Sequence, residues 1–145
     1  MSNSTYQHNV YWLLMQVMFQ AKHRVTEIAD RHGLTSMQAN TLVMLKSDEP
    51  LAMSKLSHIF MCDASNVTGI ADRLASQGLI ERKDHPTDRR IKLIAITEAG
   101  VLLRDEIIAE TLAAESERIH PVLDALEQQT LRELLNKILD ASRTN

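Results

Sequence analysis

The sequence predicts a mainly α-helical fold that carries one small β-hairpin. Apolar residues recur at intervals of three and four along most of the chain, only four Gly and three Pro interrupt it, and one pair of β-rich runs lies between residues 79 and 97. A chain of 145 residues can bury one core but is too short for two independent ones. We therefore expect a single domain over residues 1–145.

The first expected helix runs from about residue 5 to residue 31. Its apolar side chains form one stripe at helical spacing: Val10, Leu13, Leu14, Val17, Met18, Ala21, Val25 and Ile28. His32-Gly33 should end this helix, because Gly readily adopts the backbone conformation that terminates one. Thr35, with Gln38 three residues later, then has the pattern of a capping box for a second helix, which should end before Pro50.

Two short helices and a tight turn should follow, an arrangement that makes a helix-turn-helix. Leu56, Ile59 and Phe60 give the first of them its apolar side. Asp63 is placed to cap the second, and Gly78 is placed to end it. The inner face of the second helix is apolar at four positions, Val67, Ile70, Ala71 and Leu74.

The outer face of that second helix is polar and suits DNA. Ser65, Asn66 and Thr68 near its start can approach base edges, while Arg73, one to two turns later, can reach a phosphate. Gly69 lowers helix propensity by about 1 kcal/mol relative to Ala, which is understandable if DNA approaches the backbone there. An ordinary amphipathic helix with a solvated polar face is the alternative interpretation.

A basic β-hairpin should come next, with strands at residues 79–83 and 91–97 and a turn around Pro86. From residue 82 to residue 92 there are five Lys or Arg against two Asp, in a chain whose net charge is -3. A hairpin in this position is a wing. Arg89 and Arg90 at its tip can enter a narrow minor groove, and Asp88 can hold a neighbouring guanidinium. A solvated charged turn is the alternative for the arginine pair.

Four separated motifs in this region occur in one order at one spacing. They are Ser65-Asn66-Val67-Thr68-Gly69-Ile70-Ala71-Asp72-Arg73-Leu74, Gly78-Leu79-Ile80, Asp88-Arg89-Arg90 and Ile96-Thr97-Glu98-Ala99-Gly100. The set resembles the MarR family of bacterial transcription regulators, and the order of helices on both sides matches as well. Met61 and Cys62 depart from this pattern, which usually has a turn glycine and an aliphatic residue there.

The resemblance implies both a fold and a function. Residues 34–97 would form a winged helix-turn-helix that binds DNA, flanked by dimerisation helices in residues 1–33 and 98–145. The protein would be a sequence-specific transcription regulator, a ligand-responsive repressor that binds a pseudo-palindromic operator in double-stranded DNA as a homodimer. Ser65, Asn66 and Thr68 would then read the major groove. Arg73 would match the arginine of the recognition helix, and Asp88 and Arg90 would match the wing pair.

The flanking helices carry much apolar surface. Thr97 can cap a long helix with Glu98 in its first turn, and Pro121 should interrupt this helix. A last helix has its own stripe, begun by Leu123 and Leu126 and continued by Leu131, Leu134, Leu135, Ile138 and Leu139. A dimer interface would bury this surface, whereas burial within one subunit would account for part of every stripe.

Patterns of catalysis, metal binding and cofactor binding are not found in the sequence. The six His show no pair at metal-ligand spacing on one helix face, and there is no Gly-rich phosphate loop or nucleophile elbow. We expect no enzyme, no metal site and no cofactor. A helical dimerisation or adaptor module with an incidental basic wing is the alternative, and it should show no salt-sensitive binding to duplex DNA.

Two regulatory hypotheses stay open. Relatives in the MarR family bind small aromatic effectors, and five residues are candidates to line such a pocket, although Met and aromatic side chains at helical spacing are more often core. These five are Trp12, Met15, Phe19, Met37 and Met44. Cys62 lies just before the cap of the recognition helix, where a thiol could sense oxidants. We favour the alternative, in which Cys62 is an inert buried residue.

The sequence also predicts a soluble cytoplasmic protein. No apolar run approaches the roughly 20 residues that span a bilayer, and the N-terminus lacks the pattern of a signal peptide. The single Cys62 cannot form an internal disulfide, which fits a reducing compartment.

Overall fold

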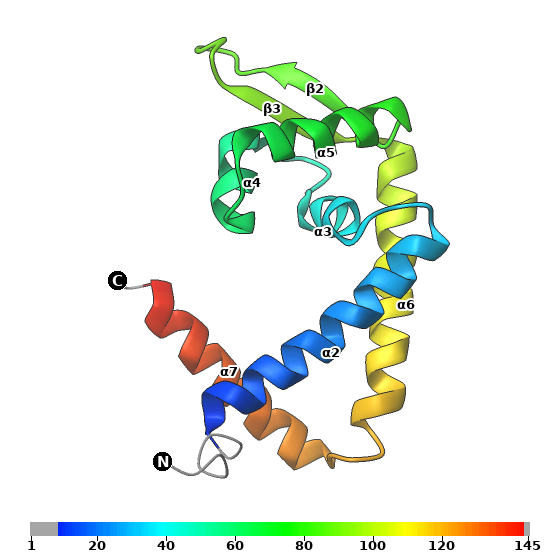
Figure 1. The fold of residues 1–145 in the computed structure, drawn as a ribbon, viewed down its shortest axis with the longest axis vertical. Helices are drawn as coiled ribbons and strands as arrows, with labels where there is room; N and C mark the ends of the chain where they lie inside the picture. Colours follow the sequence, from blue (N-terminus) through cyan, green and yellow to red (C-terminus); the bar gives the residue numbers. More distant parts are fainter. Residues whose placement is uncertain (1–8, 144–145) are drawn as a thin grey trace. The chain divides into compact units, whose positions relative to one another are not determined.

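The structure, a computed structural model, describes residues 9–143 and the side chains of residues 9–141 (Figure 1). The chain divides into two compact units, Met1–Thr111 and Leu112–Asn145. Within the described residues the elements are, in order, α2 (Val10–Arg31), α3 (Ser36–Met44), β1 (Leu51–Ala52), α4 (Met53–Phe60), α5 (Ala64–Ser76), β2 (Ile80–Asp84), β3 (Lys92–Ile96), α6 (Glu98–Ile119) and α7 (Ala125–Arg143). The predicted class, mainly α with a small hairpin, is confirmed.

Local capping explains where the first helices begin and end. The Asn9 side chain accepts the Tyr11 N–H at 2.8 Å, so α2 begins at Val10, and Thr5, near its expected start, lies outside the described residues. Gly33 takes a left-handed φ of 68° directly after the helix. Thr35 and Gln38 form the predicted capping box, in which each side chain accepts the backbone N–H of the other residue.

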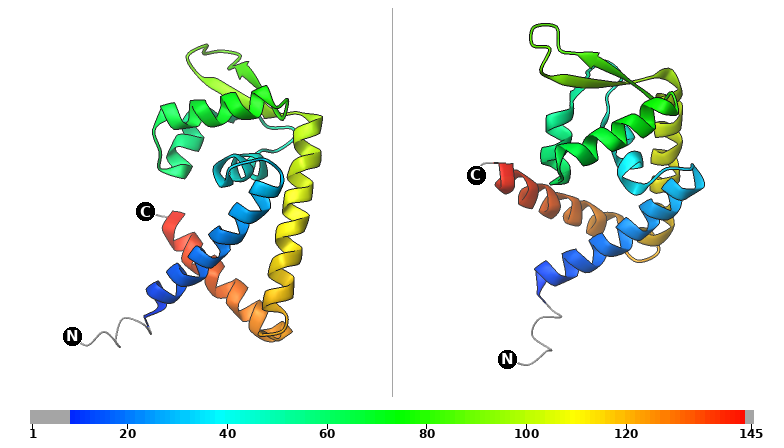
Figure 2. Two further views of the ribbon diagram at one scale, coloured as in Figure 1. Left: turned by 45° about the vertical axis from the view of Figure 1, so that its right-hand side comes forward. Right: turned by 45° about the horizontal axis from the view of Figure 1, so that its top comes forward.

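The sheet has one strand more than the sequence predicts. The two-residue β1 pairs with β3 on the side opposite β2, giving three antiparallel strands in the order β1-β3-β2. The run Leu51–Ala52 is too short to show an alternating pattern, so sequence reasoning did not find it. In the views of Figure 2 the β2–β3 hairpin extends beyond the helices of the first unit.

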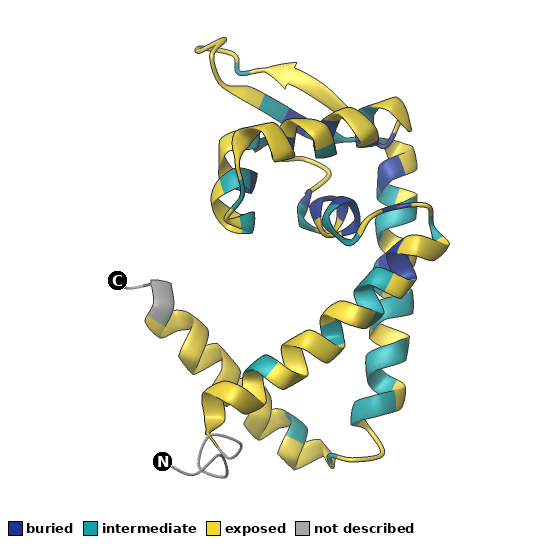
Figure 3. Ribbon diagram, viewed as in Figure 1, coloured by how far each residue is buried: buried dark blue, intermediate teal, exposed yellow. Residues whose placement is uncertain are grey.

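The core of the first unit lies where α3, α5, the sheet and the first half of α6 meet. Its most fully buried side chains come from five elements and the residue after α3: Leu42, Leu45, Leu56, Leu74, Ile94 and Ile107. Figure 3 shows these elements turning their buried positions inward, while α7 and the N-terminal half of α2 are mostly exposed. The core holds α5 through one face only, which leaves its other face open.

The turn between α4 and α5 holds Met61 where the MarR pattern usually has a glycine. Met61 adopts a left-handed φ of 49°, which costs a residue with a Cβ roughly 1–2 kcal/mol. Hydrogen bonds around it hold the turn: the Cys62 N–H donates to Ser57 O at 3.1 Å, and the Ser57 hydroxyl donates to Cys62 O at 2.7 Å. Met61 therefore takes a backbone conformation that glycine adopts without steric cost, and the neighbouring hydrogen bonds hold it there.

The start of α6 is joined to the end of α5. Thr97 caps α6 as predicted, since its Oγ1 accepts the Gly100 N–H at 3.1 Å, and the same hydroxyl donates to Gly78 O at 2.6 Å. Gly100 is buried, and a Cβ on it would collide with the carbonyl oxygen of Leu79. Glycine here allows α6 to approach the α5–β2 connection closely.

The second unit contains the last part of α6 and all of α7. As predicted, α6 ends just before Pro121. A cap that the sequence analysis missed begins α7: the Asp124 carboxylate accepts the Glu127 N–H and the Glu127 carboxylate accepts the Asp124 N–H, both at 2.9 Å. Among the described side chains of α7, all of the stripe residues from Leu131 to Leu139 are exposed.

Candidate nucleic-acid interface

Helix α5 presents a mainly polar face to solvent. Val67, Ala71 and Leu74 are buried beneath it and Ile70 is half-buried, as the spacing predicts. The residues on the other side are all exposed: Ala64, Ser65, Asn66, Thr68, Gly69, Asp72 and Arg73. The structure thus brings the four predicted DNA-contacting residues of this helix onto one open surface.

Asp63 stands at the capping position of α5 but does not cap it with its side chain, which corrects the predicted role. Its backbone is extended, with φ −67° and ψ 152°, and no side-chain capping hydrogen bond forms. The Asp63 carbonyl instead accepts the N–H groups of Asn66 at 3.0 Å and Val67 at 3.3 Å. The exposed carboxylate is left in water, and the first turn rests on backbone hydrogen bonds alone.

The hydroxyl of Thr68 already donates a hydrogen bond within α5. Its Oγ1 donates to Ala64 O at 2.9 Å, so its single proton is used and only its lone pairs and methyl group can face a partner. Those groups suit a base that offers an amino group or a methyl, such as adenine or thymine. No similar hydrogen bond holds the side chain of Asn66, which is exposed within the described part of the chain.

The tip of the wing is closed by backbone contacts and by Asp88. The His85 N–H donates to Ile91 O at 3.1 Å, and the Ile91 N–H donates to Asp88 O at 3.0 Å. The Asp88 carboxylate accepts the Arg90 backbone N–H at 3.0 Å, whereas it lies 3.9 Å from the Arg90 Nε. Asp88 therefore shapes the turn more than it orients the guanidinium. The side chain of Arg90 is 95% exposed, and Arg89 is exposed beside it.

Arg82, which the sequence analysis did not single out, ties the hairpin to α5. From β2 its Nη2 reaches Asp72 Oδ1 at 2.7 Å and Thr68 O at 3.1 Å, both on α5. Arg82 is two residues after the buried Ile80, so strand alternation places both on the face turned toward α5, a signal that could have found it. Beyond it, Asp84 and Lys92 pair across the strands at 2.6 Å.

Two of the predicted residues, Thr68 on α5 and Arg90 on the wing, line one hollow. It has a volume of about 320 Å³ and is lined by residues of α4, α5 and the second arm of the wing. The lining consists of Met53, Ser54, Ala64, Val67, Thr68, Arg90, Ile91 and Lys92. Thr68 and Arg90 thus border the same space, whereas Asn66 and Arg73 are exposed on α5 outside its lining.

The candidate effector-binding residues differ in how far they are buried. Trp12 and Phe19 on α2 are 45% and 61% exposed. Met15 and Met37 are half-buried, and Met44 packs against the core of the first unit. Cys62 is half-buried and also packs against that core, in the manner of a small apolar residue.

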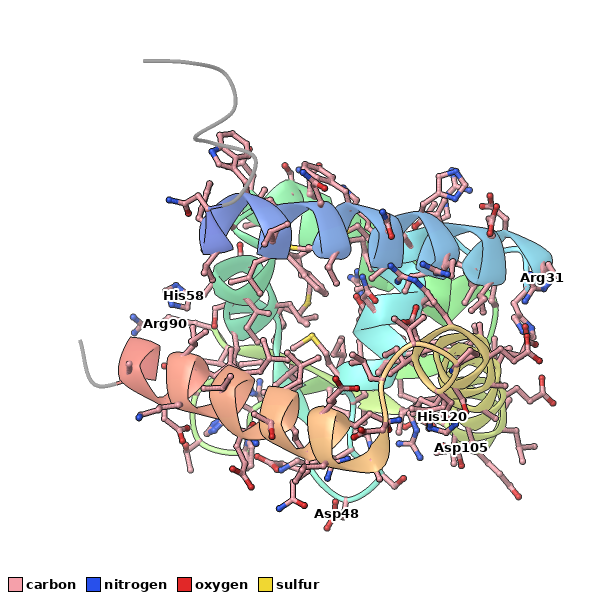
Figure 4. The ribbon with its side chains drawn as sticks, turned by 90° about the horizontal axis from the view of Figure 1, so that it is seen from below. Arg31, Asp48, His58, Arg90, Asp105 and His120 are labelled. Atoms are coloured by element: carbon pink, nitrogen blue, oxygen red, sulfur yellow. The ribbon has the colours of Figure 1, made fainter. Side chains whose placement is uncertain are left out.

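An ionic cluster joins the end of α2 to α6. Glu110 accepts Arg31 Nη2 at 2.6 Å and contacts His32 Nε2 at 2.7 Å. Figure 4 shows Arg31 at the C-terminal end of α2. These hydrogen bonds, first that from Arg31 and then that from His32, hold the pKa of Glu110 below its usual value.

Within residues 9–143, no group of three or more His, Cys, Asp or Glu side chains is placed to hold a metal ion. No helix in the same range is long and apolar enough to cross a membrane.

Comparison with known proteins identifies the class. A model of the MarR family matches residues 34–92. The HTH-type transcriptional regulator MhqR of Bacillus subtilis is 31% identical over 110 residues, covering 74% of each chain. The HTH-type transcriptional repressor NicR of Pseudomonas putida is 32% identical over 108 residues, 74% of this chain and 68% of that one. CouR from Rhodococcus jostii RHA1, solved bound to p-coumaroyl-CoA, is 28% identical with a TM-score of 0.74, covering 91% of this chain and 92% of that one.

The helix-turn-helix with its basic wing and these similarities together define a transcription regulator that binds DNA. The chain belongs to the MarR family. The resemblance stated from the four sequence motifs is confirmed, and the members of this family regulate transcription rather than catalyse reactions.

Proposed function

We propose that the protein is a repressor that binds a pseudo-palindromic operator as a homodimer and responds to a small aromatic effector. The observation that carries the proposal is the single exposed surface formed by the polar face of α5 and the basic tip of the wing. Buried apolar residues fix α5 from behind, and Arg82 fixes the wing to it. A rigid support of this kind suits sequence reading.

The surface divides into two parts with different chemistry. Ser65, Asn66 and Thr68 near the start of α5 are short and polar, and they suit base edges in the major groove. Arg73, Arg89 and Arg90 are exposed cations that suit phosphates or the negative potential of a narrow minor groove. Asp88 acts by holding the Arg90 backbone.

The homodimer is supported by apolar surface on both flanks of the chain. The N-terminal half of α2 exposes Val10, Trp12, Leu13, Val17, Met18 and Phe19, and α7 exposes Leu131, Leu134, Leu135, Ile138 and Leu139. Exposed apolar residues in such number mark an interaction surface. A two-fold dimer presents two recognition helices to successive major grooves, roughly 34 Å apart.

Repression and effector binding are supported by the relatives. NicR is named a repressor, and CouR was solved with p-coumaroyl-CoA. Trp12, Met15, Phe19, Met37 and Met44 are the residues that we propose for an effector pocket. The exposure of Trp12 and Phe19 makes them accessible, whereas the contact of Met44 with the core favours a structural role for that residue.

The decisive experiment is selection of bound DNA from a random pool, followed by titration of the selected duplex and a scrambled duplex. Asn66→Ala should cost about 1–3 kcal/mol on the selected duplex and little on the scrambled one. Arg90→Ala should weaken both and lower the dependence on salt. Lys22→Ala, on α2, removes an exposed cation that is part of neither α5 nor the wing, and it is the matched control. Equal losses on both duplexes for Asn66→Ala would contradict base reading.

Two alternatives make different predictions. An adaptor module would show no salt-sensitive binding to either duplex. An oxidant sensor would lose operator affinity after peroxide treatment and regain it with thiol, and Cys62→Ser would not respond. The packing of Cys62 against the core favours an unreactive thiol.

A further inference from the structure

Met61, in the turn between α4 and α5, combines a strained backbone with an almost fully exposed side chain. Among the described residues it is the only one other than glycine with a positive φ, which is 49°. Its side chain is 95% exposed, the largest exposed fraction of any large apolar residue in the described part of the chain. The side chain therefore adds a steric cost that glycine would avoid and gains almost no burial. Strain of this kind, uncompensated within the subunit, is typical of a functional position.

The turn lies beside the surface that we propose binds DNA. In all the ribbon views the tip of the wing extends over the end of α5 at which this turn lies (Figures 1 and 2). Ala64, the first residue of α5, lines one hollow together with Arg90 of the wing. Met61 precedes Ala64 by three residues, which can span at most about 11 Å. Ser65 and Asn66 follow directly and are exposed as well.

The chemistry around Met61 suits base edges better than phosphates. No Lys or Arg occurs from residue 56 to residue 72. Asp63, two residues after Met61, is exposed and makes no side-chain capping bond, and its negative charge disfavours phosphates nearby. The Met61 side chain itself offers a flexible, polarisable apolar surface. In the major groove the apolar group that distinguishes one base from the others is the C5-methyl of thymine.

We propose that Met61 helps to read sequence, by contacting the C5-methyl of a thymine in the major groove beside the bases that Ser65 and Asn66 read. Glycine, which the MarR pattern usually has at this position, has no side chain to make the contact. The preference for thymine therefore belongs to this chain rather than to the motif as a whole. The inference rests on the proposed function, because it requires that α5 enter the major groove.

Selection of bound DNA by the native chain and by Met61→Gly locates the base pair. We expect the two selected sequences to agree except at one position in each half-site, where the native chain enriches thymine and the variant does not. Identical preferences at every position would overturn the proposal.

Uracil substitution then tests the methyl group alone, because uracil pairs as thymine does but lacks the C5-methyl. Replacing that thymine should weaken binding by the native chain about fourfold for each half-site, the factor expected for one buried methyl group. Met61→Gly should bind the thymine and uracil operators equally. Leu102→Ala, which shortens a side chain of α6 that is 64% exposed, is the matched control and should respond to uracil as the native chain does.

Thermal unfolding separates a lost contact from a damaged turn. Met61→Gly should unfold at a temperature no lower than that of the native chain, because glycine adopts a left-handed φ freely. A variant that lost stability and operator affinity together would overturn the contact.

The same titrations distinguish failure of this inference from failure of the proposed function. A native chain that binds the thymine and uracil operators equally would overturn the role of Met61 alone. A native chain that binds no duplex in preference to a scrambled one would overturn the proposed function as well.

Discussion

Helices α5 and α7 share one sequence pattern but differ in what covers it. Both carry an apolar stripe at helical spacing, yet α5 buries Val67, Ala71 and Leu74 within its own unit, whereas every described stripe residue of α7 from Leu131 to Leu139 is exposed. A stripe predicts that apolar surface will be buried but does not say by what. The stripe of α5 is buried by the chain itself, and we infer that a second copy buries the stripe of α7.

The strongest test of this comparison pairs one leucine from each helix. Leu74→Ala should lower the free energy of unfolding by about 2–5 kcal/mol at any protein concentration, because it opens a cavity in a core that the chain forms alone. Leu135→Ala should lower apparent stability in a manner that depends on concentration, because it weakens association. Urea unfolding at two widely separated concentrations measures both. A Leu135→Ala effect independent of concentration would mean that α7 is buried within one subunit.

A second pair of variants compares two glycines of the first unit. Gly100→Ala should destabilise by about 1–3 kcal/mol, because its Cβ would meet the Leu79 carbonyl and the Ile96 side chain. Gly69→Ala has open space and should stabilise α5 by about 1 kcal/mol. Thermal unfolding measures these opposite signs. If DNA approaches the backbone at Gly69, the same stabilised variant should bind the operator more weakly, and unchanged affinity would remove that reason for the glycine.

Breaking the ion pair between Arg82 of the wing and Asp72 of α5 should change stability less and should clearly change DNA affinity. Asp72→Asn and Arg82→Gln should each destabilise by less than about 1 kcal/mol, because both side chains are partly exposed and screened by water. Each should still reduce operator affinity by letting the wing move relative to α5. A double-mutant cycle on operator affinity should show coupling between the two positions. Additive effects would indicate that the two residues act separately.

The smallest expected effect concerns acid. The pKa of Glu110 is lowered in the folded chain by its hydrogen bonds from Arg31 and His32, so its contribution to stability is present above the ordinary glutamate value of 4.5 and is lost as pH falls through the lowered value. Glu110→Gln should therefore flatten the decline of stability below that pH and change little in the neutral range beyond the loss of the ion pair itself. Chemical unfolding over a series of acidic buffers measures it, and parallel curves for the two proteins would contradict the assignment.

The sequence predicts best those helix boundaries that carry local signals. Thr35 with Gln38, Gly33, and Thr97 with Glu98 mark boundaries that the structure confirms. What it does not predict depends on pairing between distant segments. The strand β1 exists only because Leu51–Ala52 meets β3, and Arg82 finds Asp72 only once the hairpin lies along α5.

In the candidate interface, too, the features set by local sequence were predictable and the others were not. Exposure of Ser65, Asn66 and Thr68 follows from helical periodicity, so the open face of α5 was predictable. Two details were not predictable, because side-chain rotamers decide them. The Thr68 hydroxyl donates to Ala64 O, and the Asp63 side chain does not cap α5. Which residues touch DNA stays a prediction until variants are titrated.

The hydroxyl of Thr97 has a consequence for how motion could pass through the first unit. One hydroxyl both donates to Gly78 O, two residues after the end of α5, and accepts from the first turn of α6, so neither segment can rotate against the other without breaking one of its bonds. We expect these two bonds to make the junction move as one piece, and β3 enters it directly through Ile96. A signal that displaces the start of α6 would therefore rotate the recognition helix and the wing together. This rotation would change the orientation of the whole DNA-binding surface.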